Sequence, residues 1–187
     1  MDTSALQIQQ RITVRVVCND IAGTGILTLS ENREHIYVLT AKHVLLGKDF
    51  KNPLIKSAIT IDKILTVSNE FIFYQVKETD SVLAYDSKED DFAIIVIPAT
   101  ETTFDTDIIS RLACIDSDFG LLNCSVRGFP YLAGNTETRL LGCLFDEFRA
   151  GNSNHFLIHT VQHLETFFSD ANTNVQGLSG GRSIFYL

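Results

Sequence analysis

Short apolar segments separated by polar clusters dominate the chain. Ten of these segments are rich in Val, Ile, Phe and Tyr and often alternate in polarity, which is typical of half-buried β-strands. Gly, Asn, Asp and Ser gather between them, where turns are expected. The predicted strands are ITVRVVC (12–18), TGILTL (24–29), HIYVLTA (35–41), AITI (58–61), FIFYQV (71–76), SVLAY (81–85), FAIIVI (92–97), CSVRGF (124–129), RLLGCLF (139–145) and HFLIHTV (155–161).

Helical periodicity is weak by comparison. Only AKHVLLG (41–47) and TDIISRL (106–112) could be helical. Many short strands with little helix predict an all-β sandwich or barrel. The polar stretch PATETTFDTD (98–107) has strand-like segments on both sides, so we expect it to connect two lobes. The first lobe would cover about 1–100 and the second about 108–187.

Composition narrows the class of protein. The 187 residues suffice for one domain or for two small lobes that share a core, and 45% hydrophobic with 20% charged residues is a globular composition. The net charge of −8 argues against nucleic acid as a partner, because phosphate binding needs clustered Lys and Arg. No apolar window approaches the roughly 18–20 residues of a membrane span, so no membrane partner is expected.

Cysteine usage and the first residues bear on the compartment. The start MDTSALQIQQR lacks the basic and apolar regions of a secretion signal. The four cysteines show no CxxC spacing. We therefore expect reduced thiols in a cytoplasmic protein.

Three local features are candidates for chemistry. His43 follows a predicted strand in YVLTAKHVL, Asp91 precedes the apolar run in DDFAIIVIP, and Ser179 lies between glycines in GLSGG. Each has a plain structural alternative when taken alone: a core histidine, a polar loop end and a Gly-rich turn. Together they follow the order His, Asp, Ser, which is the order of the triad in chymotrypsin rather than in subtilisin or the α/β-hydrolases.

These motifs resemble those of the chymotrypsin/trypsin-like serine peptidases. TAKHV resembles the T-A-x-H motif, DDFAIIVI the D-[IL]-A-[LIV] motif and GLSGG the G-x-S-G-G motif. GTGIL (23–27) resembles the strand that precedes the histidine strand in HtrA-like members, and VRGFP (126–130) resembles a first-strand signature of the second barrel. The resemblance spans about residues 12–187.

The resemblance implies a two-lobed, Greek-key double β-barrel and a serine protease activity. His43 would be the catalytic base, Asp91 the acid that orients it and Ser179 the nucleophile. The backbone N–H groups of Gly177 and Ser179 would form the oxyanion hole. Thr173 lies near the expected base of the first specificity pocket, and a Thr there argues against a strong Lys or Arg preference. Protein or peptide substrates and no cofactor are implied.

Departures from the family pattern are informative. There is no Ile-Val-Gly-Gly start, and Leu178 stands where zymogen-activated members have an Asp before the serine. The usual activating ion pair therefore cannot form. No cysteine neighbours His43 or Ser179, so the disulfides of secreted members are absent there. These departures fit an intracellular bacterial-type member, and the chain resembles HtrA-like or defence-associated ones.

Three interpretations of a series of histidines stay open. His155, His159 and His163 recur every four residues, and with Cys124 or Cys143 a zinc site is conceivable. No ligand motif supports it, so no metal is expected; one histidine could instead line the substrate pocket, or all three could be structural.

The chain end is also informative by resemblance. Family members continue past the serine with two more strands, whereas only RSIFYL follows GG here. We therefore expect a truncated second barrel in a fragment of a longer protein, with a C-terminal sensor or ATPase region or a regulatory partner. The alternative function is a catalytically silent trypsin-like fold that acts as a protein-interaction module.

Overall fold

The computed structural model describes residues 3–66, 68–84, 91–101, 103–109, 123–129, 139–148 and 156–160. These residues form ten strands, three α-helices and one 3₁₀ turn. Each predicted strand is confirmed, with bounds that differ by a few residues. The elements are α1 (Thr3–Ile12), β1 (Thr13–Cys18), β2 (Ile21–Leu29), β3 (His35–Thr40), α2 (Lys42–Leu46), η1 (Lys56–Ala58), β4 (Ile59–Leu65), β5 (Phe71–Gln75), β6 (Ser81–Ala84), β7 (Ala93–Pro98), α3 (Thr106–Ile109), β8 (Asn123–Gly128), β9 (Arg139–Phe148) and β10 (Phe156–Thr160).

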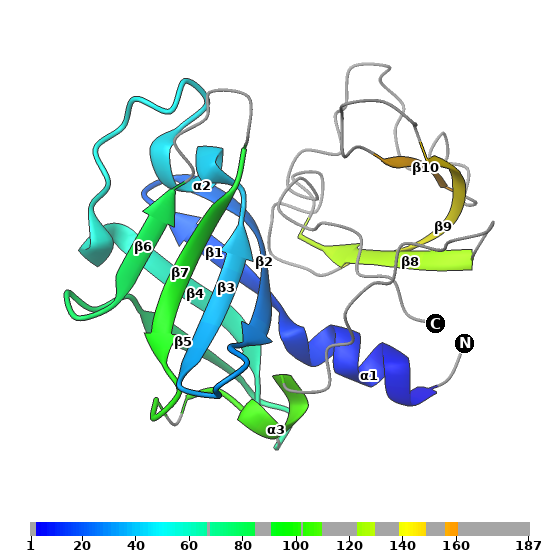
Figure 1. Ribbon diagram of the computed structural model, residues 1–187, viewed down its shortest axis with the longest axis horizontal. Helices are drawn as coiled ribbons and strands as arrows, with labels where there is room; N and C mark the ends of the chain where they lie inside the picture. The colour runs from blue at the N-terminus through cyan, green and yellow to red at the C-terminus, as the bar shows by residue number, and fades with distance from the viewer. Residues whose placement is uncertain are drawn as a thin grey trace.

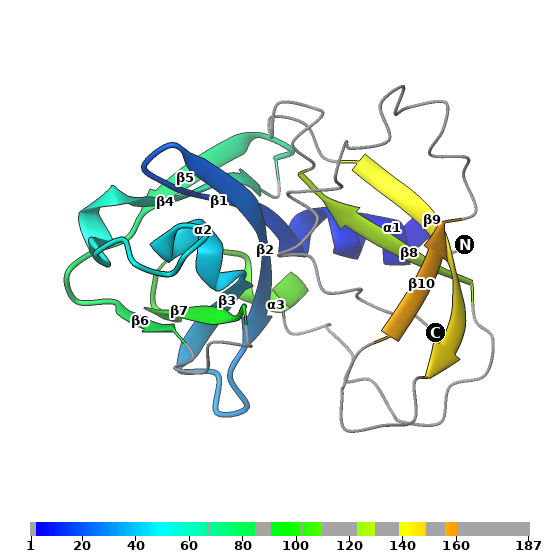
Figure 2. The ribbon, with the colours of Figure 1, turned by 90° about the horizontal axis from the view of Figure 1, so that it is seen from above.

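The strands form two antiparallel sheets. The first sheet has the order β5-β4-β1-β2-β3-β7-β6, and the second has the order β10-β9-β8. The first sheet is strongly curled. The second sheet lies next to the β1–β2 part of the first (Figures 1 and 2). This mostly β, two-sheet architecture confirms the predicted all-β fold class.

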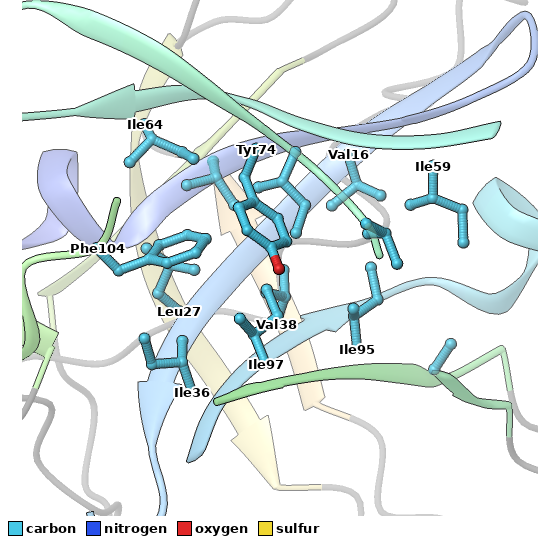
Figure 3. Close-up of a cluster of buried hydrophobic side chains, with 14 of the residues drawn as sticks. Val16, Leu27, Ile36, Val38, Ile59, Ile64, Tyr74, Ile95, Ile97 and Phe104 are labelled. Atoms are coloured by element: carbon cyan, nitrogen blue, oxygen red, sulfur yellow. The ribbon is translucent and has the colours of Figure 1, made fainter. Parts of the chain in front are cut away.

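Alternation along the strands builds the core of the first sheet. In β1, Val14, Val16 and Cys18 are buried while Arg15 and Val17 are partly exposed. The same two-residue period in β3 and β7 directs Ile36, Val38, Ile95 and Ile97 into the concave side. Tyr74 and Phe104 close this core with tilted rings 5.4 Å apart (Figure 3). The core therefore consists largely of β-branched side chains, which fit a pleated surface.

Helix α1 was not predicted from the sequence. Its Ile12 is fully buried and Ile8 packs against the core, so the helix covers one end of the first sheet. The Thr13 hydroxyl donates to the Gln9 carbonyl at 2.7 Å, and the Arg11 guanidinium donates to the Thr66 carbonyl at 2.8 Å. The spacing of Ile8 and Ile12, one helical turn apart, is the signal that could have revealed it.

Two glycines let β2 pack closely against its neighbours. A Cβ on Gly25 would lie 2.7 Å from the Val16 Cγ2 atom, inside the barrel core. A Cβ on Gly23 would lie 2.4 Å from the Val44 Cγ2 atom, on the buried side of α2. Real Cβ atoms do not approach other atoms so closely, so a side chain at either position would push its neighbour away. Gly23 thus fixes how near α2 sits to the sheet.

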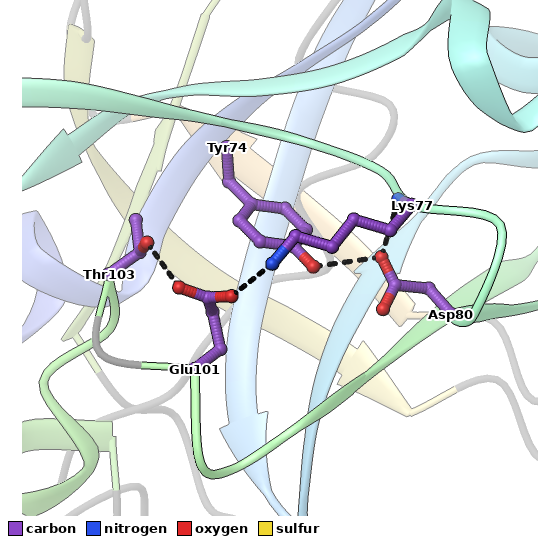
Figure 4. Close-up of polar contacts among 5 residues, drawn as sticks. All are labelled: Tyr74, Lys77, Asp80, Glu101 and Thr103. Atoms are coloured by element: carbon purple, nitrogen blue, oxygen red, sulfur yellow. Dashed lines mark hydrogen bonds and ion pairs between the residues drawn. The ribbon is translucent and has the colours of Figure 1, made fainter.

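A polar network ties the β5–β6 connection to the segment that follows β7 (Figure 4). The buried Asp80 carboxylate accepts from the Tyr74 hydroxyl at 2.9 Å and from the Lys77 N–H at 2.7 Å. The Lys77 ammonium pairs with Glu101 at 2.6 Å, and the Thr103 hydroxyl also donates to Glu101. Burial and then the Asp80 hydrogen bond raise the pKa of the Tyr74 hydroxyl, so it stays a donor.

We expect Gly23→Ala to destabilise the protein by about 1–3 kcal/mol, because the new methyl group overpacks the contact with Val44. Urea unfolding of the Gly23→Ala, Val44→Ala and double variants measures this cost. In the Val44→Ala background the Cγ2 atom is gone, so the alanine at position 23 should cost less. An equal cost in both backgrounds would contradict the packing argument.

We also expect Glu101→Gln to remove part of the acid dependence of stability. The hydrogen bond from Lys77, followed by that from Thr103, lowers the pKa of Glu101. A lowered folded-state pKa stabilises the protein above the unfolded pKa of about 4.3, and this contribution is lost as the pH falls through the folded value.

Urea unfolding between pH 6 and pH 3 checks this expectation. The stability difference between wild type and Glu101→Gln should shrink toward pH 3. The exposed neighbour Glu78, changed to Gln, is the matched control. A difference that stays constant with pH would refute the role given to Glu101.

Candidate active site

The pairing of β3 with β7 brings two distant segments to one edge of the first sheet. Thr40, the last residue of β3, is the partner of Ala93, the first residue of β7. The chain therefore leaves β3 toward α2 at the same edge where it enters β7. His43 and Asp91 flank this point, three residues after Thr40 and two before Ala93.

Helix α2 turns the chain back over the end of the barrel as soon as β3 stops. Val44 and Leu45 are each 1% exposed and anchor the helix on the core. The helix ends at Gly47, whose φ of 76° is in the left-handed region and whose N–H donates to the His43 carbonyl at 2.9 Å. The carbonyl of His43 is thus held by the glycine that closes the short helix.

Asp91 contacts His43 through both of its carboxylate oxygens. Oδ1 accepts from the backbone N–H of His43 at 2.8 Å, and Oδ2 contacts the Nδ1 atom of the imidazole ring. The two contacts fix the backbone and the ring plane together. With Nδ1 on the carboxylate, the neutral ring carries its proton there and its Nε2 lone pair is left to accept a proton from a second group.

The pair is partly open to solvent. The side chains of His43 and Asp91 are 26% and 38% exposed. A catalytic base needs this combination, because it must be held in one orientation and yet be reached by a substrate.

Two buried side chains make further contacts that hold α2 in place: Cys18 on β1, and Lys42 in the helix itself. The thiol of Cys18 donates to the Leu45 carbonyl at 3.5 Å, and burial raises the pKa of that thiol, so it stays protonated and packs as a small apolar group. The ammonium of Lys42 lies 4.1 Å from the centre of the Phe50 ring. The Cys18 contact holds α2 on β1, and the Lys42 contact packs the first residue of the helix against the segment that follows it.

Among the predicted site residues, His43 and Asp91 are brought together. Gly177, Ser179 and Thr173 lie outside the described residues, so their predicted roles stay predictions. The same holds for the zinc alternative: His155 and His163 are outside the described residues as well. In the ranges that the structure describes, no three His, Cys, Asp or Glu residues are placed to hold a metal ion.

Sequence reasoning did not identify a contact between the two sheets that lies close to this edge. The backbone N–H of Phe129, next to the end of β8, donates to the Thr24 hydroxyl at 2.9 Å. The Thr24 carbonyl accepts from the Thr40 hydroxyl at 3.0 Å. GTGIL (23–27) resembles a family motif, but the motif alone does not show that its threonine joins β3 to the segment after β8.

No helix in the described part of the chain is long and apolar enough to cross a membrane. A comparison with protein-family models gave no match, and a comparison with curated proteins gave none either.

Solved structures of serine proteases, in contrast, are similar over nearly the whole chain. A serine endoprotease from Yersinia pestis has a TM-score of 0.53 at 18% identity, covering 95% of this chain and 51% of its own. The Rv3671c protease of M. tuberculosis in its active form has a TM-score of 0.52 at 14% identity, with 98% and 71% covered. Deg5 has a TM-score of 0.56 at 14% identity, with 97% and 80% covered.

The chain spans about half the length of the Yersinia enzyme. Identities this low speak to the fold and not to the activity. The chain therefore has the fold of the trypsin-like serine proteases.

Proposed function

We propose that the protein is a serine endopeptidase in which His43, Asp91 and Ser179 form the catalytic triad. The observation that supports it best is the double contact of Asp91 with the backbone N–H and the ring Nδ1 of His43. A buried structural histidine needs no carboxylate that fixes both its backbone and its ring tautomer. The trypsin-like fold and the order of the three motifs along the chain add to this support.

The proposed reaction is acyl transfer to the serine. His43 Nε2 takes the proton of the Ser179 hydroxyl as the oxygen attacks a peptide carbonyl, and the imidazolium then gives this proton to the leaving amine. Asp91 stabilises the imidazolium and remains a carboxylate. A water, deprotonated in the same way by His43, attacks the acyl-enzyme and releases the acid product with the free serine.

Two further groups complete the proposal. The N–H groups of Gly177 and Ser179 would stabilise the oxyanion, an effect of about 3 kcal/mol for one such donor. Thr173 would lie at the base of the specificity pocket, where an uncharged hydroxyl does not select for Lys or Arg. Both assignments are supported by the G-x-S-G-G resemblance.

The proposal extends to a cytoplasmic effector of bacterial defence, in which a C-terminal sensor or ATPase region or a regulatory partner controls the protease. This extension is supported by the resemblance to intracellular trypsin-like domains and by Leu178. A leucine stands there where zymogen-activated members have an Asp, so the usual zymogen switch cannot operate. Such an enzyme would cleave peptides only after the molecule that activates it, here called its effector, is added. A catalytically silent interaction module is the alternative, and it would bind partners without cleaving any peptide.

We expect a fluorophosphonate probe to label the full-length protein at Ser179. Ser179→Ala should abolish labelling, because the probe bonds to the nucleophilic oxygen. Ser183→Ala, four residues further along the same glycine-rich end, is the matched control and should label normally. Labelling that persists in Ser179→Ala would overturn the nucleophile assignment. Absence of both labelling and peptide cleavage, with and without effector, would support the silent module.

Asp91→Asn should lower kcat by about 10³–10⁴-fold, because the amide cannot hold the ring with its proton on Nδ1. The Michaelis constant should change little, because Asp91 faces His43 and not the substrate. Steady-state cleavage of a peptide substrate measures both constants. A variant that keeps kcat within about tenfold of wild type would show that Asp91 has no orienting role.

A further inference from the structure

Thr24 is completely buried between the two sheets. It lies near the start of β2, and its exposed fraction is 0%. A buried Thr must satisfy both its backbone and its hydroxyl group. Thr24 does so with two segments that are far apart in the sequence: its carbonyl accepts from Thr40 and its hydroxyl from Phe129.

On one side, Thr24 holds the strand end that leads to His43. Its carbonyl accepts from the Thr40 hydroxyl at 3.0 Å. Only Ala41 and Lys42 separate Thr40 from His43. The preceding residue, Gly23, leaves the space that Val44 occupies, because a Cβ there would lie 2.4 Å from the Val44 Cγ2 atom. Two successive positions of β2 thus set the place of the turn that carries His43.

On the other side, Thr24 holds the second sheet. Its hydroxyl oxygen accepts from the backbone N–H of Phe129, which is 1% exposed and follows β8. β8 contacts β1 and β2, so this bond lies within the contact between the sheets. The residue thus connects the edge that bears His43 to the part of the chain that continues toward Ser179.

Thr24 lies beside an ion pair that joins two neighbouring strands. Its partner across the β1–β2 ladder is Arg15, which forms a two-point ion pair with Asp62 on β4. The ion pair joins β1 to β4, and the β1–β2 ladder joins Arg15 to Thr24, so the position of Thr24 is linked to both strands.

We propose that Thr24 is a positioning residue of the peptidase: one residue aligns the His43 turn and the second sheet, and so sets the distance between His43 and Ser179. This inference rests on the proposed function. Its effect on the reaction is transmitted through Thr40 and Phe129, the two residues that donate hydrogen bonds to it.

The test compares Thr24→Val with Thr24→Ser in the full-length protein. Valine has the shape of threonine without the acceptor, whereas serine keeps the acceptor. Thr28→Val, on the same face of the same strand, is the matched control. Amide hydrogen exchange at Phe129 and at Val16 reads the sheet contact, and peptide cleavage reads kcat and KM separately.

In Thr24→Val, the Phe129 amide should exchange about tenfold faster or more, because it loses a buried partner, while Val16 is unchanged. The kcat should fall by about ten- to hundredfold, because the His43 turn and the second sheet are no longer aligned. The KM should stay within about twofold of the wild-type value. Thr24→Ser should restore both readouts. Unchanged exchange and kcat in Thr24→Val, or equal losses in Thr28→Val, would overturn the proposal.

Thr40→Val provides a second test if Thr24→Val does not fold. It removes the bond on the His43 side alone, so kcat should fall while Phe129 exchange stays as in wild type. An unchanged kcat would overturn the positioning role. If the wild type neither labels nor cleaves, the proposed function fails, and the exchange data still decide whether Thr24 fixes the second sheet.

Discussion

The pairing of Thr40 with Ala93 is the constraint on which the candidate site depends. Antiparallel strands that are held in register place the end of one beside the start of the other. A shift of one residue would turn every core side chain of β7 outward, so burial of Ile95 and Ile97 enforces the register. The contact between His43 and Asp91 is therefore a consequence of core packing and does not depend on flexible loops finding one another.

The short turn after β3 converts this register into a defined imidazole position. Val44 and Leu45 are buried, and Gly23 offers the space that the helix needs. Asp91 then fixes the ring from the other strand. Few degrees of freedom remain for His43, which is what preorganised catalysis requires. Fold stability and site geometry are thus provided by the same contacts.

The sequence predicted the strands well because their signal is local. The β-branched, apolar composition of β1, β3 and β7 is visible within each short strand, although only the structure shows which side chains of the continuously apolar β7 face the core. Helix α1 was not predicted because several polar Gln residues interrupt its short apolar face, which weakens the helical pattern. Gln9 is buried, and tertiary contacts rather than its polarity decide this.

The site was predicted for a different reason. Nothing in the local pattern says that residues 43 and 91 meet; the family motifs supplied that pairing, and the register explains it. The role of Thr24 could not be predicted, because its partner Phe129 is 105 residues away and hydrogen bonds across sheets leave no periodic signal.

The most direct test of the account is a crystal structure of the full-length protein after reaction with a peptidyl phosphonate. The account predicts a bond between phosphorus and the Ser179 oxygen, with His43 Nε2 within about 3.2 Å of the reacting group and Asp91 still on Nδ1. An adduct on another residue, or a His43 ring turned away from the adduct, would contradict it.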